Sequence, residues 1–231
     1  MRNRSSRLLP LLGAAVFVGF YIVNDLVRSA VATSPLPLPN APDDDIYRYV
    51  TGEPLAVGLP AAAHLLSSVG LLIFVLASRQ VEPRRAGDLA DRWSRLAGLV
   101  AVAALTTSAA LSITLAVAAA LPAGVVLGLN QAAFVTGGTL HVASLGVYIA
   151  LTGRTYAERS VRGLAWVAAV LAVLSLISLV WFYGTALILL GRLLSMAWLV
   201  LAGAALTRVG RPSPVPDVAP TEGRTDRQAA P

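Results

Sequence analysis

One arginine stands inside an apolar stretch that is long enough to cross a membrane. The segment from Thr185 to Leu206 covers about 22 residues and contains a single charge, Arg192. A charged side chain in hydrocarbon is costly, so Arg192 requires a partner, a water-filled cavity or the membrane interface. Its guanidinium group fits a carboxylate of the protein and an anionic ligand equally well, because its donors form a planar fork.

Other polar residues fall at a similar depth. With a rise of about 1.5 Å per residue, Arg192 lies roughly 10 Å from the outer boundary of the hydrocarbon, and Asp25 and His64 share that outer part. We therefore predict that Arg192 meets Asp25, with His64 nearby. The alternative is that Asp25 pairs with Arg28 one turn away, while both arginines extend to the headgroups. The candidate binding residues are Asp25, Arg28, His64, Asn130, Gln131 and Arg192.

The two histidines, His64 and His141, allow one cofactor hypothesis. Histidines on facing helices can ligate haem iron. The chain has only two histidines and no cysteine, so we favour hydrogen-bonded core histidines and predict no metal and no cofactor.

The sequence contains no nucleophile–base pair, no HExxH motif, no phosphate loop and no nucleotide fingerprint. We therefore do not expect an enzyme. Hydroxyl residues in 106–114 and the Gly137-Gly138 pair are typical of close helix packing in membranes. The glycine pair alternatively loosens its helix.

Composition and hydropathy predict the fold class. Of 231 residues, 56% are hydrophobic and 13% are charged, which is about half the charge of a soluble domain. We predict an all-α, polytopic membrane protein with a bundle of six transmembrane helices, a proline-rich loop at 34–54 with one short turn at 46–50, and a disordered cytoplasmic tail at 207–231. The predicted spans are about 8–30, 55–78, 94–121, 126–151, 163–182 and 185–206.

The arginines also predict the orientation. With both termini in the cytoplasm, fifteen of the 18 basic residues fall on the cytoplasmic side, and only Arg28 and Arg48 fall outside. We therefore predict a multi-pass protein of the plasma membrane. The net charge of +6 does not indicate nucleic acid, because the arginines are scattered over short loops. The first helix is expected to be retained, with cleavage after Ala32 as the alternative.

The layout resembles a group of uncharacterised six-helix membrane proteins of high-GC bacteria, grouped under a domain of unknown function. The resemblance rests on an arginine-led first helix, the segment Asp43-Asp44-Asp45-Ile46-Tyr47-Arg48-Tyr49, the 79–95 loop and the small residues of the third and fourth helices. It implies no activity and assigns no functional residue.

Two functions remain open. The abundance of Ala, Gly and Ser and the lack of catalytic motifs favour a structural or accessory subunit that binds other integral membrane proteins. The polar residues at related depth favour a small-solute or lipid-handling, transporter-like protein with an outward-facing site. The expected partners are the lipid bilayer, with other membrane proteins or anionic lipid, and no nucleic acid.

Overall fold

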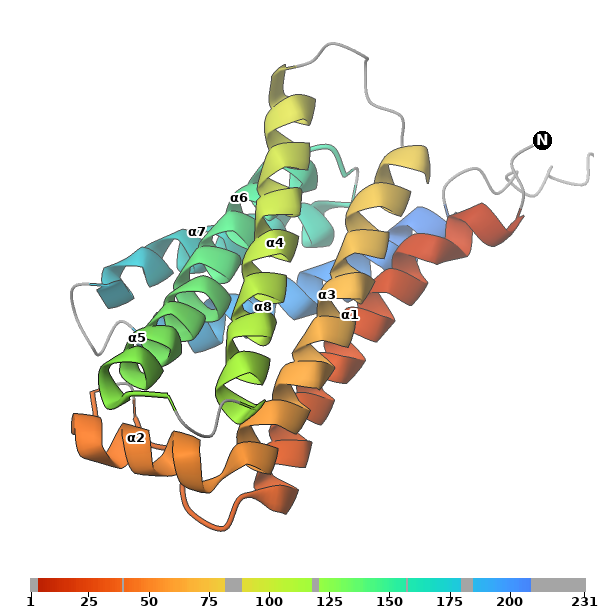
Figure 1. Cartoon of the computed structure of the whole chain (residues 1–231). Coiled ribbons are helices and arrows are strands. Elements are labelled where there is room, and N and C mark those ends of the chain that lie inside the picture. The colour runs from red at the N-terminus through yellow and green to blue at the C-terminus, as the bar shows by residue number, and fades with distance from the viewer. Residues whose placement is uncertain are drawn as a thin grey trace, which may run out of the picture.

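A computed structural model of the chain describes residues 4–38, 40–81, 89–117, 121–156, 158–179 and 185–208. These residues form helices and their connections, with no strand among them (Figure 1). The predicted tail at 207–231 lies outside the described residues, except for Thr207 and Arg208, which continue the last helix.

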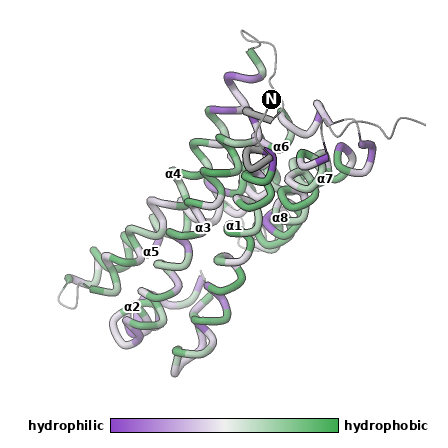
Figure 2. The backbone as a smooth tube through the Cα atoms, turned by 90° about the vertical axis from the view of Figure 1, so that its right-hand side faces the viewer, coloured by the Kyte–Doolittle hydropathy of each residue, from purple (hydrophilic) through white to green (hydrophobic). Residues whose placement is uncertain are grey.

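Within the described ranges, six helices are long and apolar enough to cross a membrane, which confirms the all-α, multi-pass fold class. Apolar residues predominate along these helices, while hydrophilic residues gather near the bundle's ends (Figure 2). The spans are α1 (Arg4–Val31), α3 (Pro54–Val81), α4 (Leu89–Val117), α5–η1–α6 (Ala123–Phe134, Val135–Leu140 and His141–Gly153), α7–η2 (Arg159–Leu174 and Ser175–Leu179) and α8 (Thr185–Arg208).

The third span begins earlier than its apolar run. α4 begins at Leu89 rather than at residue 94, and its predicted end near residue 121 follows residues 118–120, which lie outside the described residues. The early start is stabilised by an ion pair between Asp91 of its first turn and Arg79 of α3. An apolar run therefore reports the hydrocarbon thickness, whereas the helix continues into the polar region.

The six spans form a closed ring in which each span packs against the next one in the sequence and α8 returns to α1. The centre is filled by large buried side chains, among them Phe17, Phe74 and Trp198. The ring closes where Gly203 of α8 lies against the backbone of Leu11 of α1. The beginning of the first span and the end of the last span therefore lie at the same end of the bundle.

The tightest contact joins α1 and α3 through two glycines. A Cβ atom on Gly13 would lie 2.6 Å from the backbone nitrogen of Phe74, and Gly70 lies equally close to the backbone of Phe17. Ser67 donates a hydrogen bond to the carbonyl oxygen of Phe17 at 2.8 Å, which adds to the same contact. Small residues let membrane helices approach in this way and gain van der Waals contact.

A short helix, α2 (Asp43–Gly52), lies across one end of the bundle (Figure 1). The predicted loop with a single turn at 46–50 is therefore wrong in part, since ten residues are helical. Pro42 precedes the helix, and three aspartates occupy its first turn, where negative charge stabilises the helix dipole. Tyr49 and Val50 are buried against apolar residues of the neighbouring spans, which holds α2 on the bundle.

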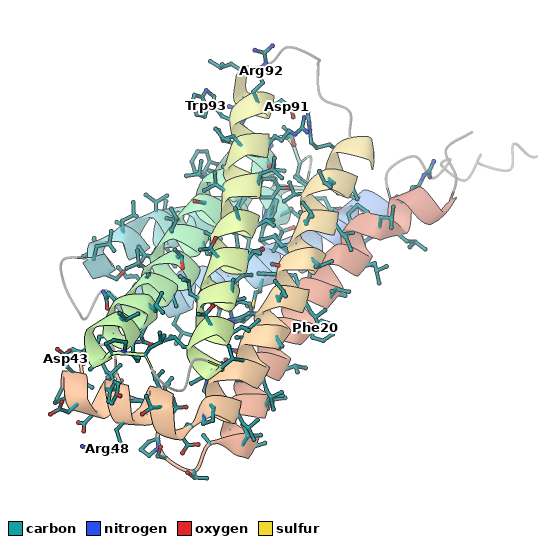
Figure 3. The ribbon with its side chains drawn as sticks, in the orientation of Figure 1. Phe20, Asp43, Arg48, Asp91, Arg92 and Trp93 are labelled. Atoms are coloured by element: carbon teal, nitrogen blue, oxygen red, sulfur yellow. The ribbon has the colours of Figure 1, made fainter. Side chains whose placement is uncertain are left out.

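Polar side chains mark both ends of the molecule. Asp43 and Arg48 lie on α2 at one end, whereas Asp91 and Arg92 lie at the opposite end of α4 (Figure 3). This polar–apolar–polar order is the one that a bilayer requires of a spanning bundle.

Candidate functional site

A cavity of about 370 Å³ lies at the α2 end of the bundle. It is open on one side and is lined by the end of α1, the α1–α2 connection, α2, and parts of α3, α4, α5, η1 and α8. Its charged lining residues are Arg28 and Arg192, and among the residues that the structure describes no Asp or Glu lines it. The cavity is therefore electropositive.

Arg192 projects from the second turn of α8 and is held by two neutral groups. Its Nη2 donates a hydrogen bond to the carbonyl oxygen of Gly137 at 3.2 Å, and its Cζ lies 4.7 Å from the centre of the Tyr21 ring. Its Nε is buried and has no hydrogen-bond partner within the described ranges. The protein therefore leaves one donor of the guanidinium group unsatisfied.

The Gly137 carbonyl is available to Arg192 because the fourth span is irregular there. Residues Val135–Leu140 form a π-helix, whose wider turns leave backbone carbonyls without their usual partner. Two hydroxyl groups also donate to carbonyl oxygens just before this segment: Ser108 Oγ to that of Ala133 at 2.7 Å, and Thr136 Oγ1 to that of Ala132 at 2.7 Å. Gly137 permits the close approach of Ser108, since a Cβ atom there would lie 2.7 Å from Ser108 Cβ.

Further buried polar atoms surround the guanidinium. The rings of Tyr21 and His64 pack 4.8 Å apart. Within the part of the chain that the structure describes, Tyr21 Oη, His64 Nε2 and Tyr49 Oη are buried without a hydrogen-bond partner. His64 and Tyr49 line the cavity, whereas Tyr21 supports Arg192 beside it. Unsatisfied buried polar atoms are rare in proteins and often mark a functional site.

The structure brings five of the six predicted binding residues around this cavity and leaves Asp25 out. The cavity is lined by Arg28, His64, Asn130, Gln131 and Arg192. Asn130 is half-buried and Gln131 is exposed, and both come from α5.

The predicted ion pair between Asp25 and Arg192 is wrong. Asp25 is exposed, and its carboxylate accepts a hydrogen bond from Asn24 Nδ2 at 2.8 Å. The alternative pair with Arg28 is not formed either, because the ion pairs of the described residues do not include Asp25. Asn24 takes the buried position of this turn, and an amide is cheaper to bury than a carboxylate.

His141 lies away from the cavity, in the core. Its Nδ1 lies 2.9 Å from the carbonyl oxygen of Ala101, and its ring packs on Phe17. Phe17 in turn packs on Tyr21, and Tyr21 packs on His64. Two aromatic side chains of α1 thus connect the histidines, so the arrangement does not suit haem ligation by both. The described residues contain no group of three or more potential metal ligands.

The α1–α2 connection is tied to the start of α3 by Glu53. Its Oε1 accepts hydrogen bonds from the Thr33 backbone N–H at 3.0 Å, from the Thr33 hydroxyl, and from Ser34 Oγ at 3.0 Å. The hydrogen bond from the Thr33 side chain, with support from Ser34, lowers the pKa of Glu53 below its ordinary value. The ionised carboxylate therefore fastens the segment that closes one side of the cavity.

Three site features were not predicted from the sequence as site residues: Tyr21, Tyr49 and the Gly137 carbonyl. Tyr21 shares a helical stripe with Asn24 and Arg28, and this spacing was the available signal. The Gly137-Gly138 pair was interpreted as a helix-packing feature, with a loosened helix as the alternative, and the hydrogen bond to Arg192 was not predicted.

Comparison of the chain with family models, with curated proteins and with solved structures gives no match. The resemblance to six-helix membrane proteins of high-GC bacteria therefore stays a prediction, and function has to be argued from the cavity.

Proposed function

We propose that this protein is a small-solute or lipid-handling membrane protein whose ligand is an anion that binds the Arg192 cavity. The observation that carries the proposal is the charge of the cavity wall. Two guanidinium groups, Arg28 and Arg192, line it, and none of its described lining residues is acidic. A carboxylate or phosphate supplies the missing negative charge.

The energetics favour an anion over a neutral ligand. An arginine within a transmembrane helix costs about 2.5–3.5 kcal/mol on insertion scales, and neutral partners offset only part of this cost. Arg192 contacts a carbonyl and an aromatic ring, so its charge stays uncompensated by the protein. Its Nε is buried without a hydrogen-bond partner among the described residues, so the protein satisfies the guanidinium group only in part. A guanidinium group of this kind binds carboxylate and phosphate oxygens through charge-assisted hydrogen bonds.

The arginine distribution supports an outward-facing cavity. If both termini are cytoplasmic, as fifteen of 18 basic residues suggest, the α2 end faces the outside. The ligand then enters from the extracytoplasmic solution or from the outer leaflet of the plasma membrane.

The accessory-subunit function stays a prediction. The exposed leucines and valines on the outer faces of the spans contact lipid in any membrane protein, so they do not favour a protein partner. The Arg192 cavity is the specific observation, and it favours ligand handling.

The test is anion-dependent stability of the purified protein in a non-ionic detergent. Inorganic phosphate and acetate are titrated at constant ionic strength, with chloride as the reference. We expect saturable stabilisation of the wild type and of Arg92→Gln, a matched control at the opposite end, and its loss in Arg192→Gln.

Native mass spectrometry separates the two sources of the anion. A lipid that the wild type retains and Arg192→Gln loses identifies the anion as a lipid headgroup. If no lipid is retained and only added phosphate or acetate binds, the anion is a solute. If the protein retains no anionic lipid and no added anion has an Arg192-dependent effect, the proposal is contradicted.

A further inference from the structure

We infer that the ligand of the Arg192 cavity is an amphiphilic anion, with one carboxylate or phosphate head and a single apolar chain of roughly medium length. This inference rests on the proposed function and deepens it. It follows from the size of the cavity, from the distribution of its polar and apolar residues, and from the exposed leucines at its rim.

The cavity is larger than an inorganic anion needs. Its volume is about 370 Å³. At about 30 Å³ for each water-sized group, this space holds roughly a dozen such groups. A phosphate or acetate ion would fill less than half of it, so the space has room for a further part of the same ligand.

The remaining wall is apolar. The side chains of Val57, Phe134 and Ile188 line the cavity beside the polar residues, and no second cluster of charge faces Arg192 among the described lining residues. Pockets with mostly apolar walls and a few polar groups bind ligands with an apolar body and one fixed polar end. An alkyl chain loses nothing against these apolar side chains.

The rim of the cavity also has exposed apolar side chains. Leu36 and Leu38 of the α1–α2 connection line the cavity and are 53% and 63% exposed. They lie in a proline-rich segment that is fastened by Glu53 and leads into the acidic start of α2. Two exposed leucines on the rim favour the entry of a molecule that has an apolar chain.

The assignment of the two parts follows from these positions. The head binds between Arg192 and Arg28, beside His64, and the chain lies against Phe134 and the rim leucines.

The test compares ligands that differ only in chain or head: acetate, decanoate and decanol. The protein is placed in nanodiscs of zwitterionic lipid, and thermal unfolding is followed against the free aqueous ligand concentration. We expect half-maximal stabilisation by decanoate at a concentration at least tenfold lower than by acetate. Decanol, which has the chain without the charge, should act equally on the wild type and on Arg192→Gln, because it only partitions into the bilayer.

Two variants separate head from chain. Arg192→Gln should abolish the stabilisation by both anions. The double variant Leu36→Ser, Leu38→Ser should raise the concentration of decanoate for half-maximal stabilisation at least threefold and leave that of acetate unchanged. Arg92→Gln should match the wild type. If Arg192→Gln does not fold, Arg192→Lys serves in its place. Lysine keeps the charge and loses the planar guanidinium donors, so both anions should need higher concentrations for half-maximal stabilisation.

The failures are distinguishable. Equal half-maximal concentrations for acetate and decanoate would overturn the amphiphile and leave an anion-binding protein. No Arg192-dependent effect of either anion would overturn the proposed function as well. An effect of decanol that equals that of decanoate in the wild type would show that the head contributes nothing, and the inference would fall.

Discussion

Arg192 keeps its full charge because both of its partners are neutral. The Gly137 carbonyl and the Tyr21 ring orient the guanidinium group and lower the cost of its burial, and neither removes the positive potential. A carboxylate in their place would have closed the site to anions. At the scale of one residue, the choice of neutral partners therefore separates a ligand-binding arginine from a structural ion pair.

Tyr21 offers a direct measurement of this support. Tyr21→Leu removes the ring beneath Arg192 and should lower the free energy of unfolding by about 0.5–2 kcal/mol beyond the packing loss. Tyr21→Phe keeps the ring and removes a hydroxyl that has no partner among the described residues, so it should match the wild type. Chemical unfolding in detergent measures both. Equal losses in the two variants would show that the hydroxyl, rather than the ring, matters.

Glu53 predicts a pH dependence. Its hydrogen bonds lower the pKa of the Glu53 carboxyl group in the folded protein below the ordinary value of 4.5. Between the folded and unfolded pKa values of this group, the unfolded state therefore binds more protons than the folded state. The stabilisation is complete above about pH 4.5 and is lost as the pH falls through the folded-state pKa. The difference in unfolding midpoint between the wild type and Glu53→Gln should therefore be largest at neutral pH and shrink below pH ~4.5. A difference that stays constant down to pH ~3 would contradict this role.

At the scale of elements, hydrophobicity predicts the spans better than it predicts what lies between them. The apolar runs indicated six helices because hydrocarbon allows few other backbone structures. α2 was missed in part because four prolines around it suggested a loop, whereas Pro42 and the three aspartates start a helix. The π-helix was missed because a local change from α-helical to π-helical hydrogen bonding produces no distinct pattern of residue types in the sequence. Gly137-Gly138 marked the place without revealing the geometry.

The π-helix provides a comparison of neighbouring residues. Gly137→Ala places a Cβ atom against Ser108 and should destabilise the protein by about 1–3 kcal/mol. At Gly138 the nearest atom lies at 3.6 Å, so Gly138→Ala should be neutral or slightly stabilising. Thermal unfolding of the two variants is the measurement, and equal effects would show that the packing of Ser108 on this segment is unimportant.

A second pair of variants tests the contact of α1 with α3. Gly13→Ala sets a Cβ atom 2.6 Å from the Phe74 backbone nitrogen, and because backbone cannot move aside cheaply, we expect a loss of about 1–3 kcal/mol. Gly19 lies in the same helix and has no atom within 4 Å of its would-be Cβ, so Gly19→Ala is the matched control. A Gly13→Ala variant as stable as the control would mean that the two helices can separate without cost.

At the scale of the whole molecule, the sequence predicts the depth of a residue in the membrane but not whether its side chain faces the interior of the bundle. Counting helical rise placed Arg192, His64 and Arg28 toward the same end of the bundle, and the structure places them around one cavity. The same count could not decide whether Asn24 or Asp25 faces inward, since the two are neighbours on one turn. That choice depends on the packing of α1 against the rest of the ring, which the sequence of α1 alone does not contain.

The last prediction concerns the orientation of the whole bundle, on which an outward-facing cavity depends. The chain contains no cysteine, so a single introduced thiol reports its own side of the membrane. Asp44 is exposed on α2, and Arg92 is exposed at the opposite end of α4. If the arginine-rich end is cytoplasmic, a membrane-impermeant maleimide should label Asp44→Cys in intact cells and should label Arg92→Cys only after permeabilisation. The reverse pattern would turn the cavity toward the cytoplasm, where its anion would come from inside the cell. Labelling of both variants in intact cells would mean that the chain inserts in two orientations, and the bias of fifteen arginines would then be too weak to orient it.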